Sequence, residues 1–276
     1  MQEENGVKSW RDILDFPLAG RHPKPRVNGL TMVIDKGLGL TETRELLEMA
    51  ADYIDFIKLG FGTSALYSAK LLQEKIQLVR SYGVDIFPGG TFLEVAVLQG
   101  KLDAYLETSR QLGYTFVEVS DGTIEMAPEE RAAAIIKARQ AGFQVISEVG
   151  KKDPRDRVST MHIHEQIEAD LACGAFKVIV EGRESGKGVV IYDSKGDIKQ
   201  DELEDLVEGV RDLTVILWEA PLKQQQQELI MRFGPNVNLG NVQPADVLAM
   251  ETLRVGLRGD TLRATLRSQL AGAGGR

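Results

Sequence analysis

The sequence has little of several features that mark particular classes of protein. Cys173 is the only cysteine among 276 residues, which excludes an internal disulfide and any zinc site built from several cysteines. No apolar run is long enough to cross a bilayer, and the polar start, Met1 to Lys8, does not have the pattern of a signal peptide. A soluble, cytoplasmic protein with no membrane association is therefore expected.

Positive charge is also scarce. The 33 Lys and Arg residues face 41 Asp and Glu residues, for a formal net charge of −8, which disfavours a general affinity for nucleic acid or for an anionic membrane surface. An anionic substrate would need positive charge that is gathered locally. The composition, 43% hydrophobic and 27% charged, is that of a globular protein, and the length suffices for one large α/β domain or two smaller ones.

Short apolar runs alternate with helical patterns along most of the chain. Strands are predicted at residues 30–35, 55–59, 85–87, 116–119, 143–146, 176–180, 214–218 and 237–239. Helices are predicted at 43–53, 68–82, 128–142, 160–173, 223–233 and 245–255, with two further pieces before 113 that are broken near Gly100. Buried parallel strands have such continuous apolar runs and are joined by helices. Eight units in about 250 residues favour a single closed (β/α)8 TIM barrel.

A doubly wound open sheet is the alternative fold, because it also alternates strands with helices. No G-x-G-x-x-G motif lies between a strand and a helix, and Gly60-Phe61-Gly62 lacks the third glycine, so we interpret it as a close-approach turn. The barrel is predicted to span residues 29–262. Residues 1–28 would form an N-terminal covering arm, and residues 263–276 a short frayed C-terminal tail.

Charged and polar residues gather where the predicted strands end, which is where a (β/α)8 barrel carries its active site. Side chains alternate along a strand, so Glu118, Glu148, Glu181 and Glu219 share the faces of Phe116, Ile146, Ile179 and Leu217. If the intervening residues face the helices, these four glutamates point toward the barrel axis. The strand ends also carry Asp35, Lys36, Lys58, Thr91, Asp121, Lys151, Lys152, Arg183, Asn238 and Asn241.

Four glutamates near one mouth would repel one another and lose hydration, at several kcal/mol for each uncompensated ion. Cations must therefore be present, either a metal ion or the side chains of Lys36, Lys58, Lys151, Lys152 and Arg183. Oxygen ligands, with one cysteine and three histidines in the chain, favour Mg²⁺. A single glutamate is explained equally well by a structural ion pair. The set together favours a site for an anion and a metal ion.

Several segments at these strand ends match a known family. The chain resembles the phosphosulfolactate synthases, (β/α)8 enzymes that add sulfite to phosphoenolpyruvate and were first described in coenzyme M biosynthesis. The matching segments cover residues 27–262 in order and are Asp35-Lys36-Gly37, 52–64, Pro88-Gly89-Gly90-Thr91, Ser120-Asp121-Gly122, 148–152, 181–186, Glu219-Ala220-Pro221 and 251–260. The loop 188–192 departs from the lysine- and glycine-rich sequence of archaeal members, which leaves the pathway, to coenzyme M or to sulfolactate, open.

The resemblance implies two small anionic substrates, phosphoenolpyruvate and sulfite, and a Mg²⁺ ion that stabilises an enediolate-like intermediate. It also implies a lysine acid from 148–152 that protonates the adjacent carbon. Lys152 shares strand parity with Glu148 and is favoured over Lys151, and a lowered pKa would help it donate a proton. The predicted metal ligands are Glu118, Glu148 and Glu181. The predicted substrate-binding residues are Lys36, Lys58, Thr91, Lys151, Arg183, Ser185, Gly186 and Asn241.

Two other functions are compatible with the sequence. The same resemblance takes in plant heat-stress-associated proteins, for which a non-catalytic role in protein interaction is proposed, although the intact charged strand ends speak against lost catalysis. A different barrel lyase or aldolase acting on a phosphorylated acid would need a Schiff-base lysine, and Lys58 or Lys177 would be the candidates. The sequence allows a homo-oligomer without fixing the oligomeric state.

Overall fold

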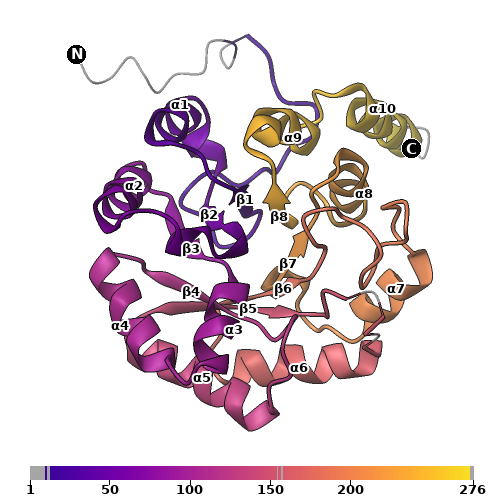
Figure 1. The fold of residues 1–276 in the computed structure, drawn as a ribbon. Coiled ribbons are helices and arrows are strands. Elements are labelled where there is room, and N and C mark those ends of the chain that lie inside the picture. The colour runs from indigo at the N-terminus through magenta and orange to yellow at the C-terminus, as the bar shows by residue number, and fades with distance from the viewer. Residues whose placement is uncertain (1–9, 11–12, 154, 157, 274–276) are drawn as a thin grey trace.

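The computed structural model describes residues 10, 13–153, 155–156 and 158–273, and it shows a parallel barrel surrounded by helices (Figure 1). The predicted (β/α)8 fold is confirmed. Each strand lies within a few residues of its predicted position, and the strands are β1 (Thr31–Asp35), β2 (Phe56–Leu59), β3 (Asp85–Pro88), β4 (Phe116–Val119), β5 (Gln144–Val149), β6 (Lys177–Val180), β7 (Ile216–Glu219) and β8 (Asn238–Val242).

The sheet is almost a complete ring. Strands pair in parallel in the order β3-β2-β1-β8-β7-β6-β5-β4, so β3 and β4 are the edge strands and meet at a seam that carries no backbone ladder in the described part of the chain. Side chains join the two sides instead. The Thr115 hydroxyl donates to Asp85 Oδ1 at 2.6 Å, and the Gly90 N–H donates to Glu118 Oε1 at 2.7 Å.

Helices follow most strands and pack around the ring. They are α1 (Leu40–Ala50), α2 (Ala69–Ser81), α3 (Gly90–Leu98), α4 (Leu102–Leu112), α5 (Pro128–Gln140), α6 (Thr160–Ala172), α7 (Gln200–Glu208), α8 (Lys223–Phe233), α9 (Val247–Arg254) and α10 (Gly259–Ala273). Short 3-10 turns are η1 (Ala51–Tyr53), η2 (Gly60–Ala65), η3 (Leu213–Val215) and η4 (Pro244–Asp246). The local sequence sets many boundaries. Pro128 begins α5 with Glu129 and Glu130 in its first turn, and Gly113 ends α4 in a left-handed conformation.

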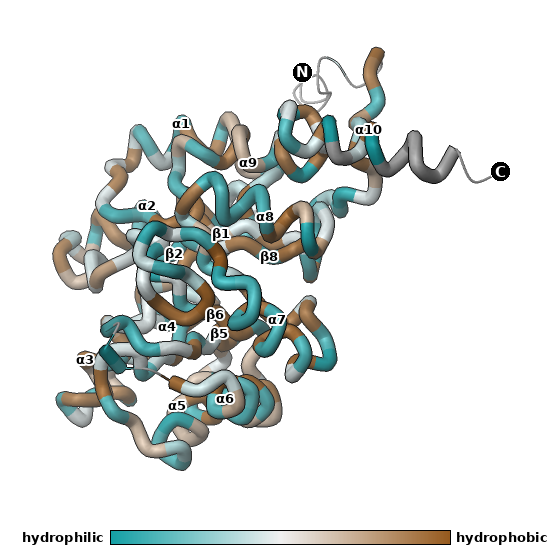
Figure 2. Tube along the Cα trace, turned by 90° about the vertical axis from the view of Figure 1, so that its right-hand side faces the viewer, coloured by the Kyte–Doolittle hydropathy of each residue, from teal (hydrophilic) through white to brown (hydrophobic). Residues whose placement is uncertain are grey.

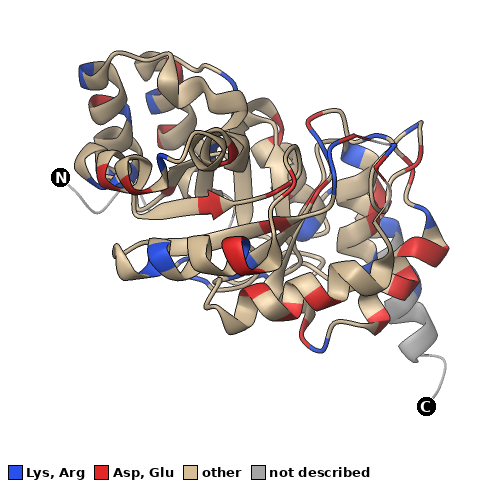
Figure 3. Ribbon diagram, turned by 60° about the horizontal axis from the view of Figure 1, so that its bottom comes forward, with Lys and Arg blue, Asp and Glu red and all other residues tan. Residues whose placement is uncertain are grey.

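The barrel interior has an apolar layer with a charged layer above it. Figure 2 shows hydrophobic segments at the centre and mixed polarity along the outer helices, and Figure 3 shows acidic residues on the central strands. The apolar layer comprises Leu30, Met32, Phe56, Phe87, Phe116, Ile146, Ile179 and Leu217. Two residues further along β2, β4, β5, β6 and β7 are Lys58, Glu118, Glu148, Glu181 and Glu219, all buried. The alternation of strand side chains thus confirms that the four glutamates face the axis.

Residues 13–28 of the N-terminal arm cross the opposite end of the barrel, and residues 1–9 and 11–12 lie outside the described part of the chain. Arg21 Nε donates to Glu251 Oε1 at 2.7 Å, and Arg26 Nη2 donates to Asp55 Oδ2 at 2.8 Å. Lys24 Nζ donates to three backbone carbonyls, those of Ala51, Ile54 and Gly83. The arm therefore closes the amino ends of the strands and leaves the carboxyl ends free for a site.

The chain near its C-terminus corrects one prediction. Residues 263–273 continue helix α10 instead of forming a frayed tail, and residues 274–276 lie outside the described part. The spacing of Leu262 and Leu266 suits a helix, with Asp260 in its first turn accepting from Lys223 on α8 at 2.8 Å. The helix packs beside α8 and α9 (Figure 1). Helix α7 had no predicted counterpart either. No described helix is long and apolar enough to cross a membrane.

Candidate active site

The charged layer opens into a cavity of about 350 Å³ at the carboxyl ends of the strands. Most of the predicted site residues line it, namely Lys58, Thr91, Glu118, Glu148, Lys152, Glu181, Arg183, Ser185 and Asn241. Lys36, Lys151 and Gly186 do not. Asn238 also lies elsewhere, because it begins β8, where its side chain accepts from the N–H of Leu30 at 3.0 Å. The eight βα connections thus bring together residues that are up to 183 positions apart in the sequence, from Lys58 to Asn241.

Lys58 is the central cation of this layer. Its Nζ lies 2.9 Å from Glu118 Oε2 and 3.0 Å from oxygens of Glu148 and Glu219. Burial alone would lower the pKa of Lys58, but Glu118, Glu148 and Glu219 outweigh burial and raise the pKa well above its usual value. A Schiff-base lysine needs a neutral amine, so Lys58 does not suit the aldolase reading. Lys177, the other candidate, donates to the Thr214 carbonyl near the amino ends of the strands.

Lys152 lies among carboxylates on the other side of Glu148. Its Nζ is 2.7 Å from Glu148 Oε1, 3.5 Å from Glu181 Oε2 and 3.8 Å from Glu94 Oε1. Burial lowers the pKa of this ammonium, but Glu148 and Glu181 more than reverse that effect, so the net shift is upward. The expected lowered pKa is therefore wrong for the protein alone, because the surroundings of Lys152 are anionic instead of cationic. Lys152 is a charged ammonium that holds a proton inside the cavity.

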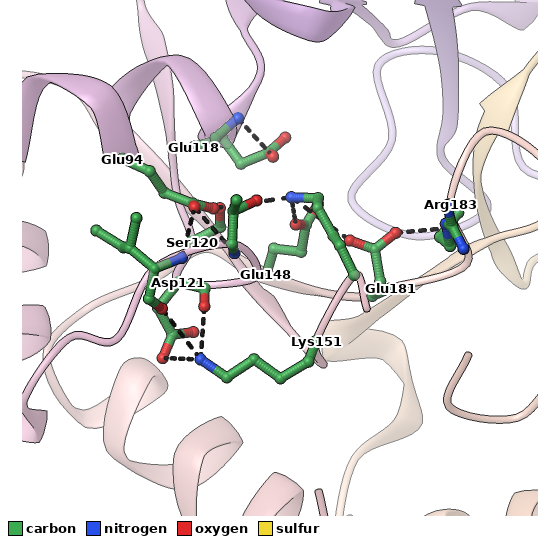
Figure 4. Close-up of polar contacts among 12 residues, drawn as sticks. Glu94, Glu118, Ser120, Asp121, Glu148, Lys151, Glu181 and Arg183 are labelled. Carbon is green, nitrogen blue, oxygen red and sulfur yellow. Dashed lines mark hydrogen bonds and ion pairs between the residues drawn. The ribbon is translucent and has the colours of Figure 1, made fainter. Parts of the chain in front are cut away.

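Lys151 points away from the cavity. Its Nζ donates to the carbonyls of Asp121 at 2.7 Å and Ile124 at 3.1 Å, and Figure 4 shows it extended toward Asp121 and away from Glu181. The backbone reverses at Gly150, where φ is +109°, and the two following lysines leave in opposite directions. Lys151 instead borders a separate hollow of about 410 Å³ between the 150–158 and 188–194 loops, which none of the four glutamates lines.

Two other predicted substrate residues are engaged outside the cavity. Lys36 Nζ pairs with Glu184 Oε1 at 2.7 Å, and both side chains are about two-fifths exposed. Since Glu184 lines the cavity, Lys36 reaches its rim only through that partner. The carbonyl of Gly186 accepts from Gln225 Nε2 at 2.7 Å, and its φ of +67° suits glycine. Gly186 therefore shapes the loop that presents Ser185.

Three of the glutamates form a compact set. Oxygens of Glu148, Glu181 and Glu219 all lie within 4.8 Å of one another. Glu118, the predicted third ligand, is outside this set, and its oxygens contact the Gly90 N–H and Lys58 at the β3–β4 seam. Glu219 is the third member of the set. Within the described residues, Glu181 Oε2 accepts no hydrogen bond although it is buried, and Lys152 Nζ lies 3.5 Å from it.

Charge and protonation differ among these carboxyls. Burial raises the pKa of Glu181 well above its usual value, and Glu148 and Glu219 add to the shift. Burial would raise the pKa of Glu148 too, but Lys152 and Lys58 reverse it, so Glu148 stays ionised. Among the described residues the cluster has two ammonium groups, those of Lys58 and Lys152, against five buried carboxyls: Glu94, Glu118, Glu148, Glu181 and Glu219. A divalent cation fits these five carboxyls, because its charge would favour the ionised forms of Glu118 and Glu181, whose pKa values burial raises.

Comparison with known proteins agrees with this geometry. The family described as (2R)-phospho-3-sulfolactate synthase (ComA) matches residues 19–260. The chain belongs to the phosphosulfolactate synthase family. It is 46% identical over 253 residues to the phosphosulfolactate synthase of Methanothermobacter thermautotrophicus, covering 91% of this chain and 98% of that protein. It is 40% identical to the phosphosulfolactate synthase of Bacillus subtilis over 90% of this chain and 97% of that one.

These relatives show that the chain is an enzyme of the phosphosulfolactate synthase type. Among solved structures, 3-hexulose-6-phosphate synthase from Salmonella typhimurium is similar with a TM-score of 0.56, over 83% of this chain and 100% of that one. At 14% identity this likeness shows the (β/α)8 fold alone.

The candidate site includes features that the pattern of strand ends did not predict. Glu94 is the only charged residue of α3 and is buried against the 120–124 loop. Its signal in the sequence is an acidic residue within an otherwise apolar helix. Three residues at the cavity, Phe61, Arg183 and Asn241, have left-handed backbone with φ of 56°, 61° and 52°. Such conformations are costly for residues other than glycine and cluster at functional sites.

Glu118 predicts a pH dependence of stability. Burial raises the pKa of its carboxyl to about 8, with Lys58 opposing the shift. Between pH 4.3 and 8 the unfolded chain loses this proton while the folded protein keeps it, so folding loses stability as pH rises. The Glu118→Gln variant does not have this loss of stability. The difference in unfolding free energy, variant minus unmodified protein, should therefore increase by about 2–4 kcal/mol from pH 5 to pH 8.

Urea unfolding at the two pH values measures this difference. Glutamine keeps a carbonyl for the Gly90 N–H, so the hydrogen bond across the seam is retained. A difference between the two proteins that stays constant from pH 5 to pH 8 would show that Glu118 does not titrate in this range.

Proposed function

We propose that this enzyme joins sulfite to phosphoenolpyruvate and forms 2-phospho-3-sulfolactate with the help of Mg²⁺. The observation that carries the proposal is the buried layer of carboxylates with the ammonium of Lys152 among them, at the mouth of a cavity sized for small molecules. The family name of the relatives supports the product. A scaffold protein has no need for so many buried charges at one strand-end cavity, because each costs desolvation.

A metal ion would be held by Glu148, Glu181 and Glu219. Their oxygens converge, and Oε2 of Glu181, which accepts no hydrogen bond among the described residues, could serve as a ligand. Mg²⁺ prefers such oxygen ligands and acts as a Lewis acid toward charge that builds up on a carboxylate. Without added positive charge, a cavity with an excess of carboxylates would repel two anionic substrates. The carboxylates that would bind the metal ion would also repel the anionic substrates, so the metal ion would be needed for substrate binding as well as for catalysis.

Lys152 is the proposed proton donor. Attack of the sulfite sulfur on the methylene carbon forms the C–S bond and moves the double-bond electrons into the carboxylate of phosphoenolpyruvate. The ammonium of Lys152 then gives a proton to the adjacent carbon, and the neutral amine is reprotonated from solvent, to which its side chain is 29% exposed. Lys58 is surrounded by three carboxylates and is less exposed, so it suits charge balance better than proton transfer.

The remaining polar residues can orient the anions. Arg183 and Ser185 come from the connection after β6, Asn241 comes from the end of β8, and all three line the cavity. Arg183 presents a guanidinium that suits phosphate or carboxylate. Thr91 lies in the first turn of α3, where backbone N–H groups favour an anion. We propose that phosphoenolpyruvate lies among these residues with its reacting carbons toward Lys152.

Incubation with phosphoenolpyruvate, sulfite and Mg²⁺ tests the function. Phosphorus NMR should show phosphoenolpyruvate converting to a new phosphate ester, and mass spectrometry should show one added sulfite. Samples without sulfite should leave phosphoenolpyruvate unchanged. Binding of phosphoenolpyruvate with no sulfonated product at any sulfite concentration would refute the proposal.

A further inference from the structure

Glu94 holds the loop that follows β4. Both of its oxygens face residues 120–124: the Ser120 hydroxyl donates to Oε1, and the N–H groups of Thr123 and Ile124 donate to Oε2 at 2.9 and 3.2 Å. Figure 4 shows Glu94 next to Ser120, at the start of this loop. The side chain is 1% exposed, so these hydrogen bonds form without competition from water.

This anchor lies at the seam of the barrel. Strands β3 and β4 do not share a backbone ladder in the described part of the chain, so pairing does not fix the chain after β4 to its neighbour. Helix α3 follows β3 directly, and Glu94 extends from it across the seam. The hydrogen bonds of Glu94 therefore replace the missing ladder where the chain leaves β4 and enters the active-site rim.

The same loop contacts the proposed proton donor. The backbone N–H of Lys152 donates to the Gly122 carbonyl at 3.0 Å. A Cβ added at Gly122 would lie 3.1 Å from Lys152 Nζ and 3.2 Å from its Cγ. Gly122 is not in the left-handed region, so its backbone does not require glycine. The space that Gly122 leaves is filled by the side chain of Lys152 on its way to Glu148.

We propose that residues 120–124, held by Glu94, form a positioning device for Lys152. Glu94 and Gly122 are its positioning residues: the first fixes the loop, and the second gives the lysine its path to Glu148. The catalytic consequence rests on the proposed function, in which Lys152 donates the proton. The placement of the ammonium group itself does not depend on the reaction.

Gly122→Ala is the sharpest test. The added methyl would meet Lys152 at Nζ and Cγ, which must shift by a few tenths of an ångström, so we expect the fold to remain and Lys152 Nζ to move away from Glu148. Displacement of a reacting group by about 1 Å can cost about 100-fold in rate. For this smaller shift we expect kcat to fall by about 3- to 10-fold, with the KM for phosphoenolpyruvate changed by less than about threefold. Gly259→Ala is the matched control, because nothing lies within 4 Å of its Cβ.

Glu94→Gln tests the anchor. The substitution keeps the size of the side chain but replaces one carboxylate oxygen by an NH2 group, which cannot accept hydrogen bonds. The 120–124 loop should therefore loosen, and kcat should fall with little change in KM. Asp55→Asn is its matched control: Asp55 is also buried and accepts from a backbone N–H, that of Thr31 at 2.8 Å, at the opposite end of the barrel. Both variants should lose stability, and only Glu94→Gln should lose turnover.

The outcomes separate this inference from the proposed function. If the unmodified enzyme forms the sulfonated product while folded Gly122→Ala and Glu94→Gln keep kcat within twofold, the positioning role is refuted and the function stands. If the unmodified enzyme forms no product, the function fails, and crystal structures of the unmodified protein and Gly122→Ala decide the positioning. An ammonium group that remains on Glu148 in Gly122→Ala would overturn it. Should Glu94→Gln not fold, Gly122→Ala still decides.

Discussion

Lys152→Ala should lower kcat by about 10²- to 10⁴-fold, the usual contribution of a general acid. The structure supports this large effect because Lys152 is the cation that reaches the carboxylate triplet from the open side of the cavity, 2.7 Å from Glu148 and 3.5 Å from Glu181. Its removal takes away the proposed proton donor and leaves those carboxylates facing the substrate. The KM for phosphoenolpyruvate should therefore also rise. Initial rates of product formation at saturating sulfite measure both quantities.

Lys151→Ala is the matched control for this prediction. The two lysines are adjacent and chemically identical, but Lys151 Nζ is held by the carbonyls of Asp121 and Ile124 outside the cavity. Its replacement removes two hydrogen bonds to the 120–124 loop but no proton donor, so kcat should fall by about 10-fold or less, far less than in Lys152→Ala. A larger loss of kcat in Lys151→Ala than in Lys152→Ala would reverse the assignment.

The fold could be predicted from the sequence because buried parallel strands have a distinct local pattern of apolar residues. Each strand is a short apolar run that ends at polar residues. The polar residues at the carboxyl ends of the predicted strands include most of the residues that line the cavity. Helices α7 and α10 were missed for different reasons. The first follows a long connection, 181–197, which obscured the alternation. The second was obscured by the glycines at the chain end, although Leu262 and Leu266 have helical spacing.

The alternation of side chains along strands could predict the site residues that lie on strands, but not those on loops or helices. Alternation predicted correctly that the four glutamates face the axis, since two residues along a strand return to the same face. Alternation also favoured Lys152 over Lys151, and Lys152 does line the cavity, but strand parity has no physical basis beyond Gly150, where the backbone turns at φ +109°. It could not find Glu94, because that residue extends from a helix across the seam. The direction of the pKa shift of Lys152 depends on which charges surround it in space, and local sequence does not contain that information.

Removal of divalent metal should abolish turnover, and Mg²⁺ should restore it. We expect EDTA treatment followed by dialysis to lower the rate by more than about 10³-fold, because Lewis-acid stabilisation of the developing charge is worth several kcal/mol. The excess of carboxyls over ammonium groups in the cavity adds to the effect, since it disfavours the entry of phosphoenolpyruvate and sulfite. Rates before treatment, after it and after titration with Mg²⁺ test this expectation.

The effect of single glutamate substitutions on Mg²⁺ affinity tests the metal site independently of activity. Glu219 belongs to the compact triplet, whereas Glu118 is held by Gly90 and Lys58. Glu219→Gln should weaken Mg²⁺ binding, measured by calorimetry on the protein without substrates, by about 10- to 100-fold or more, since even residues behind the metal ligands have effects of this size. Glu118→Gln should weaken it by less than about threefold, because Glu118 lies at the β3–β4 seam and is not part of the triplet. The opposite order of the two variants would return Glu118 to the ligand set, and full activity after exhaustive EDTA treatment would rule out the metal.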